Sequence, residues 1–146
     1  MQNKVMGLDL GTSTCGIAIS DVLGIAHGRE NYRFPEGAYR RLLGHLIEII
    51  SKEGIKEIAL GYPLNMDGSA GESAKRSERF KEELLEMDSS LKITLVDERL
   101  TTVLASKALY SGNFKSKAQK KIIDQQSAIV ILESYLSRKE QGNVGN

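Results

Sequence analysis

Apolar and polar positions alternate along the chain in a way that predicts three strands, followed by helices and short strands in turn. Apolar stretches separated by turn residues occupy Val5–Asp9, Cys15–Asp21 and Ile25–Arg33. Because only short turns separate them, we expect an antiparallel meander. Two later runs, Glu57–Gly61 and Ile93–Val96, are short and continuously apolar, which is typical of buried parallel strands. The pattern therefore predicts a mixed five-stranded sheet.

Four helices are predicted between and after these strands, because apolar residues recur there every three or four positions. The predicted helices run from Tyr39 to Gly54, from Glu72 to Met87 (burying Phe80, Leu84 and Met87), from Thr101 or Thr102 to Ser111-Gly112, and from Ser116 to about Arg138. A meander followed by βα units indicates the α/β class, with helices on both faces of the sheet. We expect one domain over residues 1–139 and a polar C-terminal tail over residues 140–146.

Composition agrees with a single globular domain. The chain has 146 residues, of which 40% are hydrophobic and 27% charged. No apolar run approaches the roughly 20 residues that span a bilayer. Met1 to Lys4 lead straight into the first strand, so we expect no signal peptide. The single cysteine, Cys15, permits no internal disulfide and is expected to be a small buried strand residue, which favours a cytoplasmic protein.

Charge is informative in its distribution, because the net charge is only +1. A cluster free of acids holds four lysines, Lys115, Lys117, Lys120 and Lys121. Such a cluster can contact the phosphates of a nucleic acid, or it can be the solvated face of a helix. The chain has no tryptophan and 5% aromatic residues, which argues against a platform on which bases stack.

Acidic residues occur at the ends of predicted strands and on the last helix. Asp9 ends the first strand, Asp97 and Glu98 follow the last strand, and Asp124 lies about two turns into the final helix. Aspartate is a poor residue for a helix interior. Asp124 shares a helix face with Ala128, Ile131 and Tyr135, and we expect that face to lie on the sheet. These positions predict carboxylates that converge on one end of the sheet.

Converging carboxylates repel one another unless a divalent cation neutralises them. Mg²⁺ or Mn²⁺ is therefore expected, and two such ions can clamp the attacking water and the leaving oxygen of a phosphodiester. This chemistry needs no histidine base, and the chain has only His27 and His45, the latter inside a predicted helix.

The alternative is that each acid has a structural role. Asp9 would then cap a turn, Glu98 would pair with Arg99, and Asp124 would pair with Lys120 one helical turn earlier.

The segment Gly61–Gly71 is the longest irregular stretch of the chain. Its proline, asparagine and glycines predict a loop at the end of a buried strand. It is either a flap that contacts substrate or a plain connection.

Four motifs together resemble the YqgF family. They are Gly7-Leu8-Asp9-Leu10-Gly11 with Gly16-Ile17-Ala18-Ile19-Ser20-Asp21, Gly61-Tyr62-Pro63-Leu64-Asn65-Met66-Asp67-Gly68, Asp97-Glu98-Arg99-Leu100-Thr101-Thr102, and Asp124 with Ala128, Ile131-Leu132 and Tyr135-Leu136. The resemblance spans Val5 to about Leu136. It implies a ribonuclease H-like fold, and members are called pre-16S rRNA nucleases or Holliday-junction resolvases.

The resemblance also implies site residues. Asp9, Glu98 and Asp124 match the acids of the family's metal cluster, with either Glu98 or Asp97 as the second ligand. Glu98 is favoured because its side chain reaches further, and Asp97 would then cap the turn or support the ligand.

Nucleic acid is expected to contact residues near these acids and the lysine cluster. The expected contacts are Thr12, Asn65, Arg99, Lys115, Lys117, Lys120 and Lys121. The family often carries a lysine after the position of Thr12, whereas Ser13 and Thr14 follow here, so this phosphate contact is missing if that lysine makes one. A second departure, Ser127 in place of an alanine, is mild.

The expected function is that of a metal-dependent endonuclease that matures the 5′ end of pre-16S rRNA in ribosome biogenesis, with ribosomal precursor particles among its expected partners. The same chemistry on a four-way DNA junction is the first alternative, and junction symmetry would favour a homodimer over a monomer. Asp9-Leu10-Gly11-Thr12-Ser13 also resembles the phosphate-binding hairpin of actin-like ATPases, which use two such domains. A non-catalytic ribosome-assembly or transcription factor is the remaining alternative.

Overall fold

A mixed five-stranded sheet forms the centre of the computed structural model, which describes residues 4–100 and 117–144, with side chains described for residues 4–99 and 125–139. The strands are β1 (Val5–Leu10), β2 (Thr14–Ser20), β3 (Ala26–Arg33), β4 (Glu57–Tyr62) and β5 (Lys92–Asp97). Their order in the sheet is β3-β2-β1-β4-β5. β1, β2 and β3 are antiparallel neighbours, whereas β4 is parallel to β1 and β5 is parallel to β4. The predicted meander with two added parallel strands is therefore confirmed.

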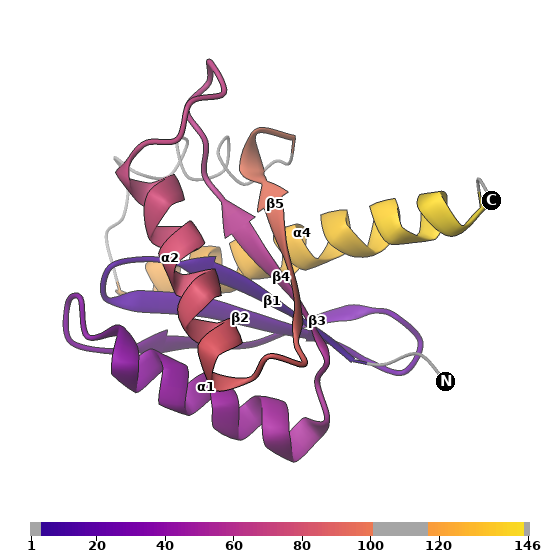
Figure 1. Ribbon diagram of the computed structural model, residues 1–146, viewed down its shortest axis with the longest axis horizontal. Coiled ribbons are helices and arrows are strands. Elements are labelled where there is room, and N and C mark those ends of the chain that lie inside the picture. Colours follow the sequence, from indigo (N-terminus) through magenta and orange to yellow (C-terminus); the bar gives the residue numbers. More distant parts are fainter. Residues whose placement is uncertain (1–3, 101–116, 145–146) are drawn as a thin grey trace.

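Helices cover both faces of this sheet, as Figure 1 shows. The helices are α1 (Tyr39–Glu53), α2 (Glu72–Met87) and α4 (Lys117–Val144), and a short 3-10 turn, η1 (Glu98–Leu100), follows β5. Gly54 caps the C-terminus of α1, and its φ of 68° is the left-handed conformation that glycine adopts most readily. The helix expected between Thr101 and Gly112 lies outside the described residues.

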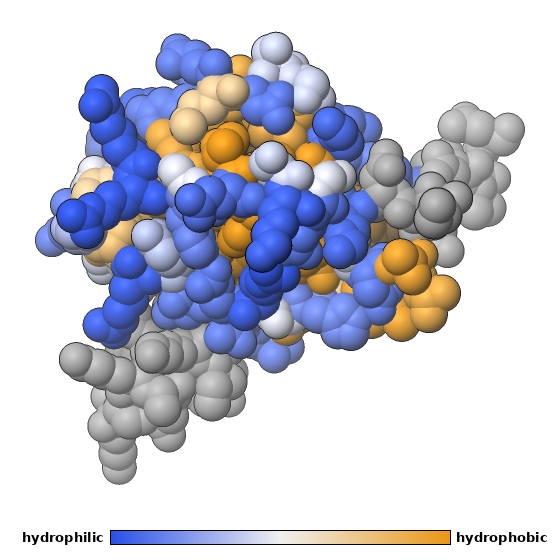
Figure 2. Space-filling model, turned by 90° about the horizontal axis from the view of Figure 1, so that it is seen from below, coloured by the Kyte–Doolittle hydropathy of each residue, from blue (hydrophilic) through white to orange (hydrophobic). Residues whose placement is uncertain are grey.

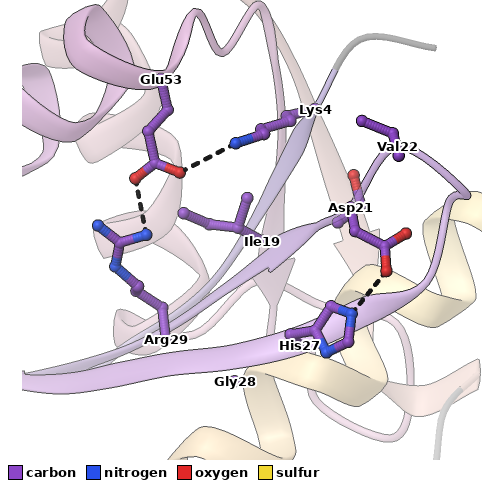
Figure 3. Close-up of a pocket in the computed structure, with 9 residues that line it drawn as sticks. Lys4, Ile19, Asp21, Val22, His27, Gly28, Arg29 and Glu53 are labelled. Carbon is purple, nitrogen blue, oxygen red and sulfur yellow. Dashed lines mark hydrogen bonds and ion pairs between the residues drawn. The ribbon is translucent and has the colours of Figure 1, made fainter. Parts of the chain in front are cut away.

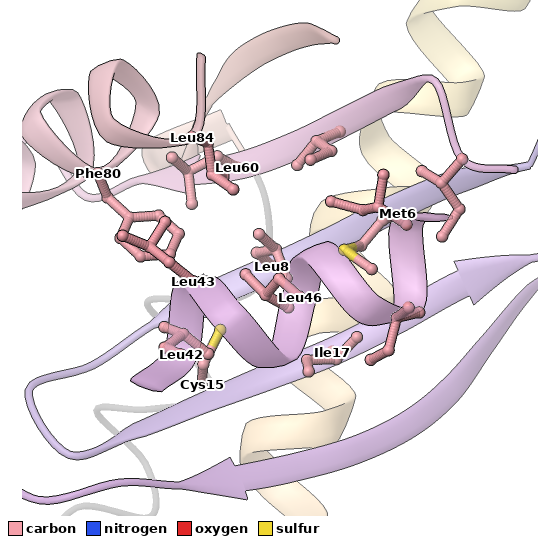
Figure 4. Close-up of a cluster of buried hydrophobic side chains, with 14 of the residues drawn as sticks. Met6, Leu8, Cys15, Ile17, Leu42, Leu43, Leu46, Leu60, Phe80 and Leu84 are labelled. Atoms are coloured by element: carbon pink, nitrogen blue, oxygen red, sulfur yellow. The ribbon is translucent and has the colours of Figure 1, made fainter. Parts of the chain in front are cut away.

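The core beneath α1 and α2 contains the larger apolar side chains (Figure 4). Met6 and Leu8 of β1 are fully buried there, together with Leu46 of α1 and Leu84 of α2. Cys15 is buried in the same core, as predicted. The prediction for Met87 was wrong, because this side chain is 52% exposed. Met87 is the last residue of α2, so no further helical turn closes over it.

The core beneath α4 combines alanines and valines with three larger side chains of the helix, Ile131, Leu132 and Tyr135. Ala128, Ile131 and Tyr135 are buried against the sheet, so the predicted inward face of this helix is confirmed for the described side chains. Gly7 allows the helix to approach β1 closely. A Cβ atom on Gly7 would lie 2.7 Å from Leu132 Cβ and 2.9 Å from the Ala128 carbonyl oxygen. The absence of a side chain at Gly7 therefore sets the distance between α4 and the sheet.

α4 continues to Val144, past the end expected near Arg138. Two contacts attach this part of the helix to the sheet. The Tyr135 hydroxyl donates to Glu57 Oε2 at 2.7 Å, and Lys139 Nζ donates to Glu57 Oε1 at 2.6 Å. The Lys139 contact lies just before the polar tail expected over residues 140–146, and the helix continues into that segment as far as Val144.

These two contacts lead to a pH-dependent prediction. Burial raises the pKa of Glu57, but the hydrogen bonds from Lys139 and Tyr135 outweigh it and hold the pKa below its ordinary value of 4.5. A depressed carboxylate pKa adds stability above the ordinary pKa, and this stability is lost as the pH falls through the lowered value. We expect Glu57→Gln to lower the free energy of unfolding at pH 7 by about 1 kcal/mol.

Urea unfolding at a series of pH values measures this effect. The difference between wild type and Glu57→Gln should shrink as the pH is lowered below 4.5. A difference that stays constant over this range would show that the contacts do not depend on the charge of Glu57.

Candidate functional site

Asp9 lies near the carboxyl end of β1, on the face of the sheet that α4 covers. Side chains alternate between faces along a strand, so Asp9 points to the same side as Gly7, which contacts Ala128 and Leu132 of α4. Asp9 is only 7% exposed, and it is the register partner of Gly16 on the neighbouring strand β2. A buried carboxylate on a central strand is held rigidly, as a ligand or catalytic group must be.

Glu98 is brought to the same corner of the sheet. It begins η1 directly after β5 and is 1% exposed. A Cβ atom on Gly61 of β4 would lie 3.4 Å from the carboxyl carbon of Glu98 and 3.4 Å from the Leu8 carbonyl oxygen. The Glu98 carboxyl group therefore lies over Gly61 of β4. Gly61 is also next to Leu8 of β1, the residue that precedes Asp9. A side chain at Gly61 would collide with Ile131 of α4, whose Cδ1 atom would lie 2.7 Å from the added Cβ.

Asp97 and Arg99 form an ion pair on either side of Glu98. Asp97 Oδ2 accepts from Arg99 Nη2 at 2.9 Å, and Asp97 Oδ1 accepts from Arg99 Nε at 3.1 Å. The hydrogen bond from the Arg99 side chain holds the pKa of Asp97 below its ordinary value. In this structure Arg99 pairs with Asp97, whereas the structural alternative above paired it with Glu98.

The loop after β4 approaches this corner as a closed turn. The Asn65 amide N–H donates to the Ser69 carbonyl oxygen at 2.9 Å, and the Gly68 N–H donates to the Asn65 carbonyl oxygen at 2.8 Å. Arg99 Nη1 donates to the Met66 carbonyl oxygen at 3.3 Å. In Figure 1 the loop rises beyond the ends of β4 and β5, on the side where η1 begins.

Two of the candidate contacts for nucleic acid lie at this end of the sheet with Arg99. Thr12 is exposed in the β1–β2 turn. Asn65 is exposed, and its side-chain amide donates to Ser69 Oγ at 2.9 Å. Of the lysine cluster, Lys117, Lys120 and Lys121 belong to the first turns of α4, as does Asp124, but their side chains lie outside the described residues. Lys115 lies outside them entirely.

The metal-ligand set is only partly visible. Among the described side chains, no group of three or more histidine, cysteine, aspartate or glutamate residues is placed to hold a metal ion. Asp9 and Glu98 are the two buried acids of this corner, and Asp124 is in α4, one turn before Ala128. The convergence of all three carboxylates stays a prediction.

The histidines lie elsewhere. His45 stacks on Tyr32 with ring centroids 3.9 Å apart and bonds to Glu30, between α1 and β3. His27 bonds to Asp21 at 2.7 Å near the β2–β3 turn. The acidic corner is therefore built without either histidine, as the sequence predicted.

A hollow of about 330 Å³ lies at the opposite end of the sheet (Figure 3). Its charged side chains are paired with one another. Glu53 forms ion pairs with Arg29 at 2.7 Å and with Lys4 at 3.4 Å, and His27 pairs with Asp21. Because these charges already have partners, the hollow offers little to recruit a charged ligand.

The β2–β3 turn beside this hollow carries exposed apolar side chains. Val22, Leu23 and Ile25 are 64%, 78% and 53% exposed. In Figure 2 apolar residues gather at one edge of a surface that is otherwise mostly polar. The turn is ordered by Asp21, whose Oδ1 accepts from the amides of Leu23 and Ile25 at 2.8 and 3.0 Å.

Sequence reasoning missed the glycines that shape the corner. A Cβ atom on Gly61 would lie 2.7 Å from Ile131 Cδ1 of α4, so this glycine allows the close approach of the helix. A Cβ atom on Gly68, whose φ is 89°, would lie 3.4 Å from Arg99 Nη1. Both are in the motif that was quoted for its loop character. A glycine at the buried end of a strand is a signal that another segment of the chain packs closely against that strand.

Comparisons with known proteins agree with this architecture. The chain matches the family described as "RuvX: Holliday junction resolvase" over residues 3–138. A protein of Geobacillus sp. named "Putative pre-16S rRNA nuclease" is 43% identical over 94% of this chain and 99% of its own length. A protein of Halalkalibacterium halodurans with the same name is 39% identical over 94% of this chain and 98% of its own.

Solved structures share the fold. Thermus thermophilus RuvC in complex with a Holliday junction substrate superposes with a TM-score of 0.58 at 15% identity, covering 95% of this chain and 97% of RuvC. A second Thermus thermophilus RuvC structure gives a TM-score of 0.55 at 12% identity, covering 94% and 96%. The expected ribonuclease H-like fold is thus confirmed. Within the part of the chain that the structure describes, no helix has the length and apolar character needed to cross a membrane.

Proposed function

The chain belongs to the RuvX, or YqgF, family of nucleases, and from this premise we propose that it is a metal-dependent endonuclease that processes the 5′ end of pre-16S rRNA. The observation that carries the proposal is the pair of buried carboxylates, Asp9 and Glu98, at one corner of a RuvC-like sheet. We place this activity in the cytoplasm, with ribosomal precursor particles as partners.

The residues present fit a divalent cation. Asp9 and Glu98 are 7% and 1% exposed and lie at the same end of the sheet, which is the arrangement expected of carboxylates that share a cation. Their oxygens are the hard donors that Mg²⁺ and Mn²⁺ take. Asp97 is less suited to be a ligand, because both of its oxygens accept from Arg99. Glu98 is therefore the second ligand in this proposal, with Asp124 as the third.

The division of labour follows from these positions. Asp9 and Glu98 would hold the cation between β1 and β5, and Asp124 would close the site from α4. When bound, a divalent cation supplies positive charge at the scissile phosphate and lowers the pKa of water. Asp9, fixed on a central strand, would orient the attacking water, and no histidine is needed to take its proton.

A four-way DNA junction is the second candidate substrate. The family description names Holliday junction resolvases, which favours this alternative. Both substrates require the same hydrolysis, so they differ in what the surface around the acids recognises. Two-fold symmetry of a junction would require two sites and hence a homodimer, whereas a single RNA cut requires only a monomer.

A cleavage assay tests the proposal. Purified protein is offered a pre-16S rRNA leader and a four-way DNA junction of equal charge, each with Mg²⁺, with Mn²⁺ and with EDTA. We expect a cut at a defined site in the leader with either metal and loss of cleavage with EDTA, because the acids cannot act without a cation.

The controls separate the alternatives. Cutting of the junction with the leader left intact would favour the resolvase, and unchanged cutting in EDTA would contradict a metal mechanism. Failure to cut either substrate with either metal would leave the non-catalytic alternative as the better account.

A further inference from the structure

The Arg99 guanidinium is committed to protein contacts on two sides. On one side, Nε and Nη2 donate to the two oxygens of Asp97. The backbone N–H of Arg99 also donates to Asp97 Oδ1, at 3.0 Å. These three hydrogen bonds join the residues before and after Glu98, so they fix the backbone from which the Glu98 side chain projects.

On the other side the guanidinium meets the loop after β4. Arg99 Nη1 donates to the Met66 carbonyl oxygen at 3.3 Å. Gly68 lies against the same nitrogen, and its φ of 89° is a conformation that other residues rarely adopt. Because the segment from Asn65 to Ser69 is closed by its own hydrogen bonds, Arg99 holds it as one unit.

From these contacts we infer that Arg99 is a positioning residue, which fixes the Asn65–Ser69 turn and the backbone of Glu98 relative to each other. This inference rests on the proposed nuclease function and changes the role that the sequence indicated for Arg99, which was a contact to nucleic acid. A guanidinium fork bound to a carboxylate is oriented in a way that a lysine cannot reproduce. The Asn65–Ser69 turn and the Glu98 carboxylate would therefore move together.

The first test uses the protein without substrate. Amide hydrogen exchange is measured for Gly68, whose N–H bonds to Asn65, and for Arg99, whose N–H bonds to Asp97. Arg99→Lys should speed exchange at both positions at least tenfold, because the fork is lost although the charge is kept. Exchange at wild-type rates in Arg99→Lys would overturn the inference. Arg40→Lys, an exposed arginine of α1, is the matched control and should change neither rate.

The second test uses cleavage kinetics. Arg99→Lys should lower kcat by about 10- to 100-fold with little change in KM, because the reacting groups are misplaced while the charge near the substrate is kept. The slope of log KM against log salt should equal that of wild type in both Arg99→Lys and Arg99→Gln. A slope smaller by about one in Arg99→Gln, with kcat unchanged, would show a direct phosphate contact and overturn the inference.

The two tests fail separately. If wild-type protein cuts neither substrate, the proposed function fails, and hydrogen exchange still decides whether Arg99 holds the turn. If wild type cuts and Arg99→Lys cuts equally well, the nuclease stands and the positioning role is refuted.

Discussion

Asp9→Asn is expected to lower the rate of cleavage by about 10³-fold, equivalent to about 4 kcal/mol of transition-state stabilisation. The asparagine keeps the size of the side chain but removes the negative charge that would hold a cation. The free energy of unfolding should change by less than about 1 kcal/mol, because the buried carboxylate is replaced by a neutral group of the same shape. Cleavage of the pre-16S leader under single-turnover conditions measures the first effect, and urea unfolding measures the second.

Two further variants, Asp21→Asn and Asp124→Asn, serve as controls for this prediction. Asp21→Asn removes a partly exposed carboxylate at the opposite end of the sheet and should cut at the wild-type rate. Calorimetric titration with Mn²⁺ should show weaker binding for Asp9→Asn and unchanged binding for Asp21→Asn. If Asp9→Asn cuts as fast as wild type, Asp9 is not part of the active site. In cells, a non-catalytic protein would keep its function with Asp124→Asn, whereas a nuclease would lose it.

The second large effect is expected for stability, from Gly7→Ala. The added Cβ would lie 2.7 Å from Leu132 Cβ and 2.9 Å from the Ala128 carbonyl oxygen, and a backbone atom cannot rotate away. α4 must therefore move from the sheet, which we expect to lower the free energy of unfolding by about 2–3 kcal/mol. Cleavage should also fall, because α4 carries Asp124.

A matched substitution controls for the loss of glycine itself. Gly44→Ala changes a glycine in the middle of α1 that has no atom within 4 Å of the added Cβ. Alanine favours helix over glycine, so this variant should be more stable by up to about 1 kcal/mol. Urea unfolding of both variants measures the contrast. Equal stability of Gly7→Ala and wild type would show that the approach of α4 to β1 is looser than described.

The elements of the fold were largely predictable because their signals are local. Apolar stretches between turn residues located the first three strands, and continuous apolar runs located β4 and β5; α2 was predicted with the bounds that the structure has. Errors arose where local pattern and position disagree. Met87 continues the apolar spacing of Phe80 and Leu84, but its place at the helix end leaves it exposed. The contacts of Tyr135 and Lys139 with Glu57, which is far away in sequence, are not visible in the local pattern of α4.

The end of the sheet at which the candidate site lies was predictable from the sequence. Parallel strands end at the same edge, which placed Asp9 with the acids after β5. The sequence favoured Glu98 over Asp97 only by the reach of its side chain, because two adjacent acids do not reveal that Arg99 engages Asp97. The close approaches at Gly7 and Gly61 are also set by tertiary packing, and the sequence shows only that a side chain is missing there.

The ordered apolar turn at Val22–Ile25 gives the molecule a convenient handle. It lies at the other end of the sheet from Asp9, roughly 15–20 Å away by the rise of β2. Leu23 is 78% exposed, whereas Cys15, the one cysteine of the chain, is fully buried. Leu23→Cys would thus offer a single accessible thiol for a fluorophore or a surface tether. Cutting could then be followed on single molecules without the attachment blocking the nucleic acid.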